Sequence, residues 1–348
     1  MEEKKISVKK ILLRFLCFIL VTILMLVIFL FCVMRVVCKG PSQTAAELFV
    51  RSVRETSAIG FLADIFFTDE EIAAMEASSN TVIEETDTSL ITVSTPSGES
   101  SDQPFTDAWG HTDADGDGLI YEVIHGSTYT GYMLIVLDPS RVKLGCFPNT
   151  GKGYTVQEFV EMNDAVAGIN GGGFADENGQ GDGSMPDTAY VHDGTVYYGS
   201  LGVGRGFIGI DDNYILHVGL DSLDAVEENH IVEGTGFGPV LVVNGEMADE
   251  ESLLSGLNPR TAIGQRSDGA ILLLVIDGRQ TNSLGASYTD LAEIMVKYGA
   301  VNACNLDGGS STLMWFNGQY VNNCASVIGI RTIPTSFIVL KKGAADNG

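Results

Sequence analysis

Two segments of the chain share a pattern in which a buried apolar strand ends at a polar side chain followed by glycines. The residues after these strands are Asn170, Gly171, Gly172 and Gly173 in the first segment and Asp307, Gly308, Gly309, Ser310, Ser311 and Thr312 in the second. Glycine after a strand lets the backbone approach a ligand, and its amides can point at an anion. The pattern predicts a binding site at the strand ends. A tight turn closed by an Asn or Asp side chain is the alternative.

Charged residues stand at the ends of two further apolar strands. Arg260 enters a strand of small apolar residues, where an unpaired cation would be costly to bury. Its planar guanidinium suits a carboxylate or a phosphate. Asp277 and Arg279 follow the apolar strand 271–276, and alternation puts residues two apart on one face. An internal ion pair and a ligand-binding pair both fit this spacing.

Several other chemistries lack their motifs. The chain has no G-x-S-x-G elbow, no P-loop, no dinucleotide fingerprint and no CxxC spacing. Asp113, Asp115 and Asp117 resemble the opening of a calcium loop, but Ile124 stands where the bidentate Glu is required. We therefore expect a solvated acidic turn there, and neither a metal nor another cofactor. Cys304 and Cys324 could form a disulfide, although two buried free thiols fit equally well.

Short strands broken by turns must position the polar residues. Turn signals such as Asp193-Gly194 and Asp268-Gly269 separate apolar runs, which predicts hairpins. Two helices are expected, one capped by Thr155 and Glu158 and one over residues 288–298 that ends at Gly299. Strands and helices do not alternate regularly, so a doubly wound sheet is excluded. The predicted class is α+β, a β-rich mixed-sheet domain with a few helices.

The N-terminal region predicts a membrane anchor. Residues 15–34 carry no charge, and their length is enough to cross a bilayer core of about 30 Å. Five basic residues precede this run, which by the positive-inside rule places the N-terminus in the cytoplasm and the rest outside. A cleaved signal peptide is the alternative. The predicted organisation is a cytoplasmic tail 1–14, a transmembrane helix 15–38, a juxtamembrane helical region 39–78, an acidic flexible stalk 79–118, a domain 119–342 and a tail 343–348.

The charge balance excludes one class of partner. Beyond residue 38 the chain has 43 acidic and 14 basic residues, a net charge of −29. Such a surface repels nucleic acid, so DNA or RNA binding is excluded. The bilayer, contacted through residues 15–38, is the expected partner.

Taken together, the motifs resemble the phosphodiester glycosidase family. The segments that carry the resemblance, in family order, are Asn170–Phe174, Gly238–Gly245, Arg260–Gly264, Asp277–Arg279, the helix Tyr288–Tyr298 and Asn305–Thr312. The resemblance covers residues 120–342. It departs from the family in a longer glycine run after Asn170 and in Asn258, which stands where many relatives have a His.

The resemblance implies a hydrolase that cleaves the C1–O–phosphate bond of a sugar phosphodiester on cell-surface or extracellular glycans. Arg260 and Arg279, with the amides of Gly171, Gly172, Gly308 and Gly309, would hold the phosphate. Asp307 would stabilise charge at C1 or orient a water, and Asn170 would hold a sugar hydroxyl. Ser310 and Thr312 would contact phosphate oxygens, and Asp277 would line the site. Two alternatives stay open: a non-catalytic glycan-binding domain in surface polysaccharide assembly, and a structural domain in which these motifs are turns.

Overall fold

A computed structural model describes residues 8–54, 59–77, 84–93, 104–148, 151–176, 181–198, 200–201, 206–326 and 329–343. The helices are α1 (Val8–Lys39), α2 (Gln43–Arg54), α3 (Phe61–Asp64), α4 (Asp69–Ala77), α5 (Val156–Met162), α6 (Leu223–Glu228) and α7 (Tyr288–Lys297). Within these residues, three short 3-10 turns cover Thr88–Leu90, Pro139–Arg141 and Gly309–Ser311.

The strands form four sheets, and every strand pair within the described residues is antiparallel. The largest sheet has the order β13 (Glu246–Met247), β12 (Val240–Val243), β16 (Ala300–Leu306), β14 (Arg260–Arg266), β15 (Ile271–Ile276), β4 (Thr130–Val136) and β3 (Leu119–His125). A five-stranded sheet has the order β18 (Gln319–Tyr320), β17 (Met314–Phe316), β6 (Ala165–Asn170), β19 (Thr335–Leu340) and β5 (Val142–Cys146). Another has the order β10 (Leu216–Leu220), β9 (Gly206–Asp211), β11 (Ile231–Phe237), β7 (Tyr190–His192) and β8 (Thr195–Tyr197), and β1 (Phe105–Thr106) pairs with β2 (Thr112–Asp113).

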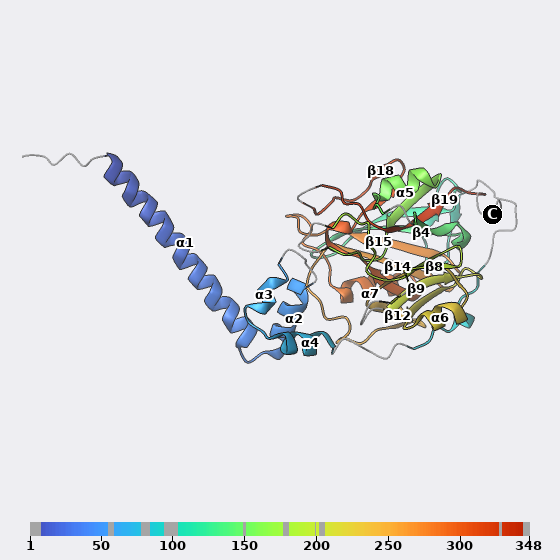
Figure 1. The fold of residues 1–348 in the computed structure, drawn as a ribbon. Coiled ribbons are helices and arrows are strands. Elements are labelled where there is room, and N and C mark those ends of the chain that lie inside the picture. The colour runs from blue at the N-terminus through green and yellow to red at the C-terminus, as the bar shows by residue number, and fades with distance from the viewer. Residues whose placement is uncertain are drawn as a thin grey trace, which may run out of the picture.

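The seven-stranded sheet is the centre of the domain (Figure 1). Its central strands β16, β14 and β15 are buried on both faces because alternate residues enter two different cores. In β14, for example, Ile263 packs against side chains of the two five-stranded sheets, whereas Ala262 packs under Leu291 and Met295 of α7. Helices α5 and α6 cover the outer faces of the five-stranded sheets. This arrangement confirms the predicted β-rich α+β class.

Local signals in the sequence account for most element boundaries. The capping box at Thr155 and Glu158 is formed at the start of α5, and Ser287 and Asp290 make the equivalent box at the start of α7. The predicted hairpin around Asp193-Gly194 joins β7 and β8, and the one around Asp268-Gly269 joins β14 and β15. The predicted cap at Thr155 and the two predicted hairpins are confirmed, because caps and tight turns satisfy backbone groups locally.

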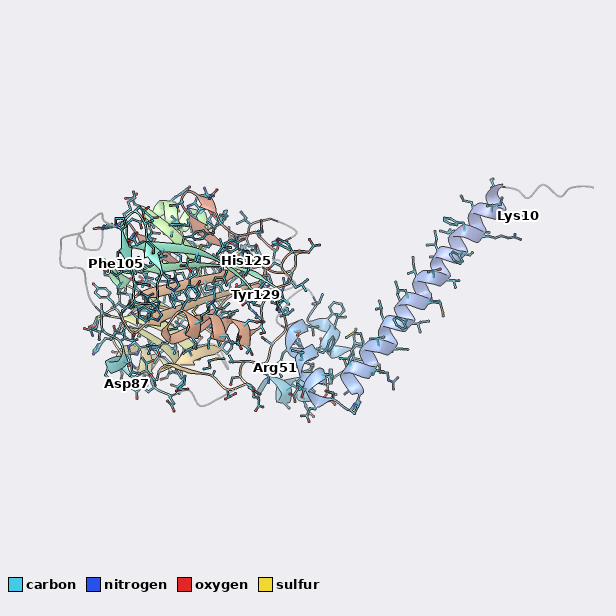
Figure 2. The ribbon with its side chains drawn as sticks, turned by 180° about the vertical axis from the view of Figure 1, so that it is seen from behind. Lys10, Arg51, Asp87, Phe105, His125 and Tyr129 are labelled. Carbon is cyan, nitrogen blue, oxygen red and sulfur yellow. The ribbon has the colours of Figure 1, made fainter. Side chains whose placement is uncertain are left out.

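The N-terminal helices form a separate small cluster beside the domain (Figure 1). Within the described residues, the helix spanning Lys9–Lys39 is long and apolar enough to cross a membrane, a property that an anchor and a signal sequence share. Helices α2, α3 and α4 fall within the region predicted as juxtamembrane. Arg51 of α2 joins this cluster to the domain by donating hydrogen bonds to the carbonyl oxygens of Glu251 and Leu254. Figure 2 shows Arg51 between α1 and the sheets.

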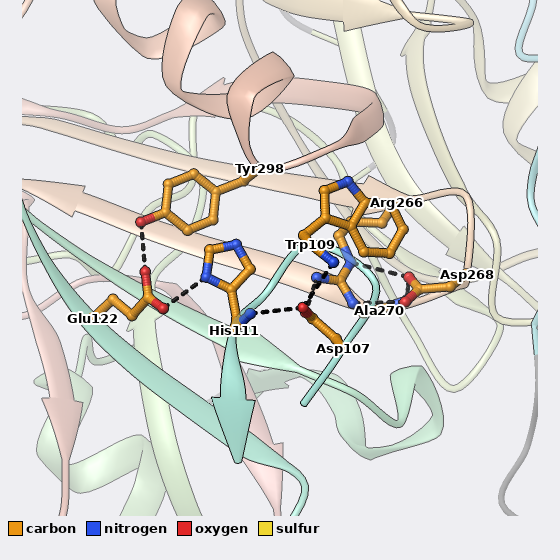
Figure 3. Close-up of polar contacts among 8 residues, drawn as sticks. All are labelled: Asp107, Trp109, His111, Glu122, Arg266, Asp268, Ala270 and Tyr298. Atoms are coloured by element: carbon orange, nitrogen blue, oxygen red, sulfur yellow. Dashed lines mark hydrogen bonds and ion pairs between the residues drawn. The ribbon is translucent and has the colours of Figure 1, made fainter. Parts of the chain in front are cut away.

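The prediction of a flexible stalk over residues 79–118 is wrong for its described parts, 84–93 and 104–118. The amide of Asp87 donates to the Asn244 side chain, and the amide of Thr92 donates to the carbonyl of Ser267. Further along, Asp107 contacts Arg266, whose guanidinium is completely buried and stacks on Trp109 at 4.0 Å (Figure 3). An acidic composition suggested solvation, but a buried cation on the domain binds one of these acids. Residues 79–83 and 94–103 lie outside the described residues.

The described residues contain two acidic clusters with the spacing of metal ligands. In the first, Asp113 accepts the amides of Gly116 and Gly118, and Asp117 accepts the amide of Leu119, so these carboxylates close the predicted acidic turn. The second comprises His192, Asp193 and Glu233, in which His192 is paired with both acids; Lys143 is also paired with buried Glu233. All six cysteines are free thiols, and burial raises the pKa of both Cys146 and Cys304.

Candidate functional site

Strand register brings the predicted site residues to one edge of the domain. Arg260 pairs with Ile276, and Thr261 pairs with Leu306, so the ends of β15 and β16 meet at the start of β14. The five-stranded sheet that contains β6 supplies Asn170 at the same place, because the amide of Asp307 donates to the carbonyl oxygen of Gly171. Residues separated by up to 137 positions therefore share one edge.

Asn170 is completely buried and connects three strands. Its side-chain nitrogen donates to the carbonyl oxygen of Asp307 at 2.6 Å. Its side-chain oxygen accepts from the hydroxyl of Thr261 at 2.8 Å and from the amide of Leu313 at 3.2 Å. The predicted contact with a sugar hydroxyl does not fit this geometry, since the amide group is already used. Asn170 instead fixes the backbone that presents Asp307.

Gly171 and Gly172 also act within the protein. Their amides donate to the carbonyl oxygen and the hydroxyl of Thr335, so the predicted use of these amides for phosphate is not supported. A Cβ at Gly171 would lie 2.6 Å from the Thr335 hydroxyl, and one at Gly172 would lie 2.2 Å from the Thr235 hydroxyl. Glycine is required here because Gly171 lies against Thr335 of β19 in its own sheet and Gly172 lies against β11 of the other five-stranded sheet.

The turn after β16 is the accessible part of the edge. Asp307, Gly308, Gly309 and Ser310 are all half-buried. Gly309 has a φ of +61° and its amide donates to the carbonyl oxygen of Pro259, which fixes the turn against the start of β14. This is the sharp, glycine-dependent turn that the sequence predicts, with an ionisable side chain at its first position.

Two guanidinium groups flank this turn. Arg279 is exposed and donates to the side chain of Asn258 at 3.1 Å, and a Cβ on Gly309 would lie 3.4 Å from one of its nitrogens. Arg331 donates to the hydroxyl of Ser310 at 3.3 Å. Both guanidinium groups therefore lie close to the Asp307 turn, and a guanidinium can form charge-assisted hydrogen bonds with a bound anion.

Arg331 is a site residue that the sequence analysis missed, together with its partner Asp176. Two nitrogens of Arg331 donate to the two oxygens of Asp176 at 2.6 Å each, and one also donates to the carbonyl oxygen of Gly181. The Asp176 hydrogen bonds, assisted by the charges of Asp176 and Asp307, raise the pKa of Arg331. The available signal was an arginine just before the buried closing strand, the same pattern that singled out Arg260.

Arg260 occupies a different position from the one predicted. Arg260 is 3% exposed, and its guanidinium donates to the carbonyl oxygens of Ala286 and Gly256. The same group stacks on Tyr288 of α7 at 4.0 Å, on the face of β14 opposite Thr261. This placement does not fit the predicted contact with phosphate and favours a role in holding α7 and residue 256 at the site edge.

Asp277 and Thr312 are buried behind the accessible turn. Asp277 accepts hydrogen bonds from Asn322, Asn323 and Tyr132, so it takes part in a polar network with the 322–323 segment. Asn322 also donates to the carbonyl oxygen of Thr312. Thr312 is 1% exposed, so the predicted direct contact between Thr312 and a ligand does not fit the structure. Both residues support the turn from inside. A hollow lined by Tyr121, Phe316, Asn317, Gln319, Tyr320 and Val321 contains none of the predicted site residues.

Fold and site together define a β-rich α+β domain with a carboxylate-bearing turn between two arginines. Residues 163–340, just over half of the chain, match the phosphodiester glycosidase family. The chain belongs to this family, which confirms the resemblance.

Three comparisons show how similar the chain is to known proteins. An uncharacterised prophage-derived protein of Bacillus subtilis is 38% identical over 81 residues, 23% of this chain and 13% of that protein. The N-acetylglucosamine-1-phosphodiester α-N-acetylglucosaminidase of cattle is 29% identical over 182 residues, 47% of this chain and 33% of the enzyme. The chain thus spans a third or less of the length of these relatives. The catalytic domain of the zebrafish enzyme, solved in a form auto-inhibited by its pro-peptide, has the same fold, with a TM-score of 0.53, 24% identity and coverage of 64% of this chain and 82% of that one.

Proposed function

We propose that the protein is a membrane-anchored hydrolase that cleaves the bond between C1 of a sugar and a phosphodiester oxygen. The name of the cattle enzyme motivates N-acetylglucosamine as the first sugar to test. The observation that carries the proposal is the half-buried carboxylate of Asp307 on a turn flanked by Arg279 and Arg331.

The two arginines would bind the phosphate. Cleavage at C1 leaves negative charge on the departing phosphate, and charge-assisted hydrogen bonds from a guanidinium stabilise it. Arg279 is exposed and oriented by Asn258, whereas Arg331 is held rigidly by Asp176. An exposed and a fixed cation together can admit the substrate and then hold its phosphate in one geometry.

Asp307 would act at the sugar. Positive charge develops at C1 in an oxocarbenium-like transition state, and a nearby carboxylate stabilises that charge or removes a proton from the attacking water. Phosphate is a good leaving group, so strong acid catalysis is less necessary. Asn170 contributes by fixing the backbone of Asp307.

The experiment is a hydrolysis assay of the full chain, in detergent, on the methyl phosphodiester of N-acetylglucosamine-1-phosphate. We expect release of free sugar and methyl phosphate, and loss of this release in Asp307→Asn. The exposed Asp224→Asn variant is the matched control and should remain active. Binding of the ester without turnover by the unsubstituted protein would contradict the proposal and favour the glycan-binding alternative.

The same proposal places the domain outside the cell. Helix α1 would span the bilayer, with Lys9, Lys10 and Arg14 on the cytoplasmic side. Lys39, at the other end of α1, is paired with Glu71 of α4, as expected at a water-exposed level. Protease added to intact cells should remove the domain but leave residues 1–14 protected.

A further inference from the structure

We propose that the site edge faces the bilayer and that the substrate is a sugar phosphodiester whose second alcohol is embedded in the membrane. The inference rests on the proposed hydrolase and its outward-facing anchor. It adds the substrate class, because an enzyme held in this orientation reaches phosphodiesters at the membrane surface before those in solution.

The helical cluster fixes the domain relative to α1. Besides the hydrogen bonds from Arg51 to Glu251 and Leu254, α2 contacts the domain at Gly256, where an added Cβ would lie 2.2 Å from the hydroxyl of Ser52. Gly256 in turn accepts a hydrogen bond from Arg260, the first residue of β14. A continuous set of contacts therefore runs from the membrane helix to the site edge.

The cluster itself lies at the level of the bilayer surface. The ring of Phe66, just after α3, lies 5.6 Å from the ring of Phe31 in α1, and Met34 packs in the same cluster. Phe31 is within the uncharged run, about 6 Å along the helix before Arg35. Phe61, the first residue of α3, and Ile65, the residue after it, are 59% and 53% exposed. Apolar side chains at this depth would enter the boundary between acyl chains and headgroups.

The site edge is the side of the domain that turns towards α1. Tyr129 precedes Thr130, whose carbonyl oxygen accepts the amide of Asp277, so the β3–β4 hairpin marks this edge. Figure 2 shows His125 and Tyr129 on the side nearer α1, and Phe105 and Asp87 on the far side. Figure 1 shows the sheets beside the C-terminal end of α1.

The chemistry suits a lipid product. Water attacks C1 and the C1–O bond breaks. The sugar leaves as a free sugar with the hydroxyl from water, and the proton goes to the medium or to the phosphate. The bond between phosphorus and the second alcohol stays intact, so the phosphate monoester remains in the membrane while the sugar diffuses away.

The kinetic test uses the full chain reconstituted in vesicles with two probes, the hexadecyl and the methyl phosphodiesters of N-acetylglucosamine-1-phosphate. At equal bulk concentration we expect the hexadecyl ester to be hydrolysed at least about tenfold faster, because a membrane-held substrate has a high effective concentration at an oriented site. Arg51→Ala should remove most of this advantage and leave the methyl ester rate unchanged. Arg54→Ala, which affects only an exposed ion pair on the same helix, should change neither.

Equal rates on the two esters would refute the inference and leave the hydrolase proposal standing. Retention of the full advantage in Arg51→Ala would also refute it, since preference would then not depend on orientation. Absence of hydrolysis of both esters would refute the hydrolase itself and the substrate class with it.

The orientation has its own readout, independent of activity. His125→Trp and Phe105→Trp place a tryptophan on two exposed positions at opposite sides of the domain. With a dansyl headgroup lipid in the outer leaflet, the gain in energy transfer over the unsubstituted protein should be larger for His125→Trp. Equal gains, or a larger gain at position 105, would overturn the proposed orientation.

Discussion

The side-chain amide of Asn170 donates a hydrogen bond of 2.6 Å to the backbone carbonyl oxygen of Asp307, across 137 positions of sequence. This bond joins the ends of β6 and β16, which belong to different sheets. It makes the placement of the proposed reacting carboxylate depend on a residue that cannot itself reach the substrate.

Replacing Asn170 should therefore lower the stability of the fold, because Asn170 holds the backbone and does not contact the substrate. Asn170→Ala leaves its partners at Asp307, Thr261 and Leu313 without their hydrogen bonds, and we expect a loss of about 3 kcal/mol in the free energy of unfolding. Denaturant unfolding in detergent measures it. Asn163→Ala, which removes one local hydrogen bond after α5, is the control. A loss below about 1 kcal/mol would contradict the role given to Asn170.

Asp307→Asn should preserve the fold and abolish most turnover. The variant keeps the shape of the side chain but removes the charge that stabilises C1, so kcat should fall by about 10²–10³. Initial rates on the methyl ester, with circular dichroism as a check on folding, measure this. Activity equal to that of the unsubstituted protein would rule out a catalytic part for this carboxylate.

Arg331→Lys should lower kcat/KM by about 10². Lysine keeps the charge but cannot make the paired hydrogen bonds with Asp176 that fix Arg331 beside Ser310. Arg54→Lys, at an exposed pair with Asp64, should have no effect on the same assay. If Arg331→Lys retained full kcat/KM, as the control should, the phosphate site would have to be assigned to other groups.

The buried Arg266 should make the 104–113 segment important for stability. In Figure 3 its guanidinium lies between Asp107, Asp268 and the ring of Trp109. Asp107→Asn removes the buried partner charge but keeps the oxygen that accepts the amides of Trp109 and His111, and should cost about 3 kcal/mol. Thermal unfolding compares it with Asp64→Asn on the surface. Equal melting temperatures would show that the segment is not part of the cooperative unit.

The His192 pair should make stability depend on pH. The hydrogen bond to buried Glu233 raises the pKa of His192, so its stabilisation is fully present below the unfolded pKa of about 6.5 and is lost as pH rises through the raised value. The difference in unfolding free energy between the unsubstituted protein and His192→Gln should be larger at about pH 6 than at about pH 9. The exposed His125→Gln should show no such trend, and a pH-independent difference for His192→Gln would exclude a charged pair.

Several features followed from the sequence because their causes are local. The apolar run of α1, the capping box of α5, the end of α7 at Gly299 and the glycine turns at Gly194 and Gly269 each depend on residues within a few positions. The family motifs also marked the correct strand ends, including Asn170 and Asp307.

Tertiary structure decided what each of these side chains touches. Arg260 begins a buried strand and Arg331 lies shortly before one, yet one stacks on Tyr288 behind the sheet and the other reaches Ser310 beside Asp307. The difference arises because strand register and sheet packing set the face on which a side chain emerges, and these depend on partners more than a hundred positions away. The sequence by itself determined the apolar N-terminal helix, the α+β class and the family. Only the folded domain separated the residues that can meet a substrate from those that hold them in place.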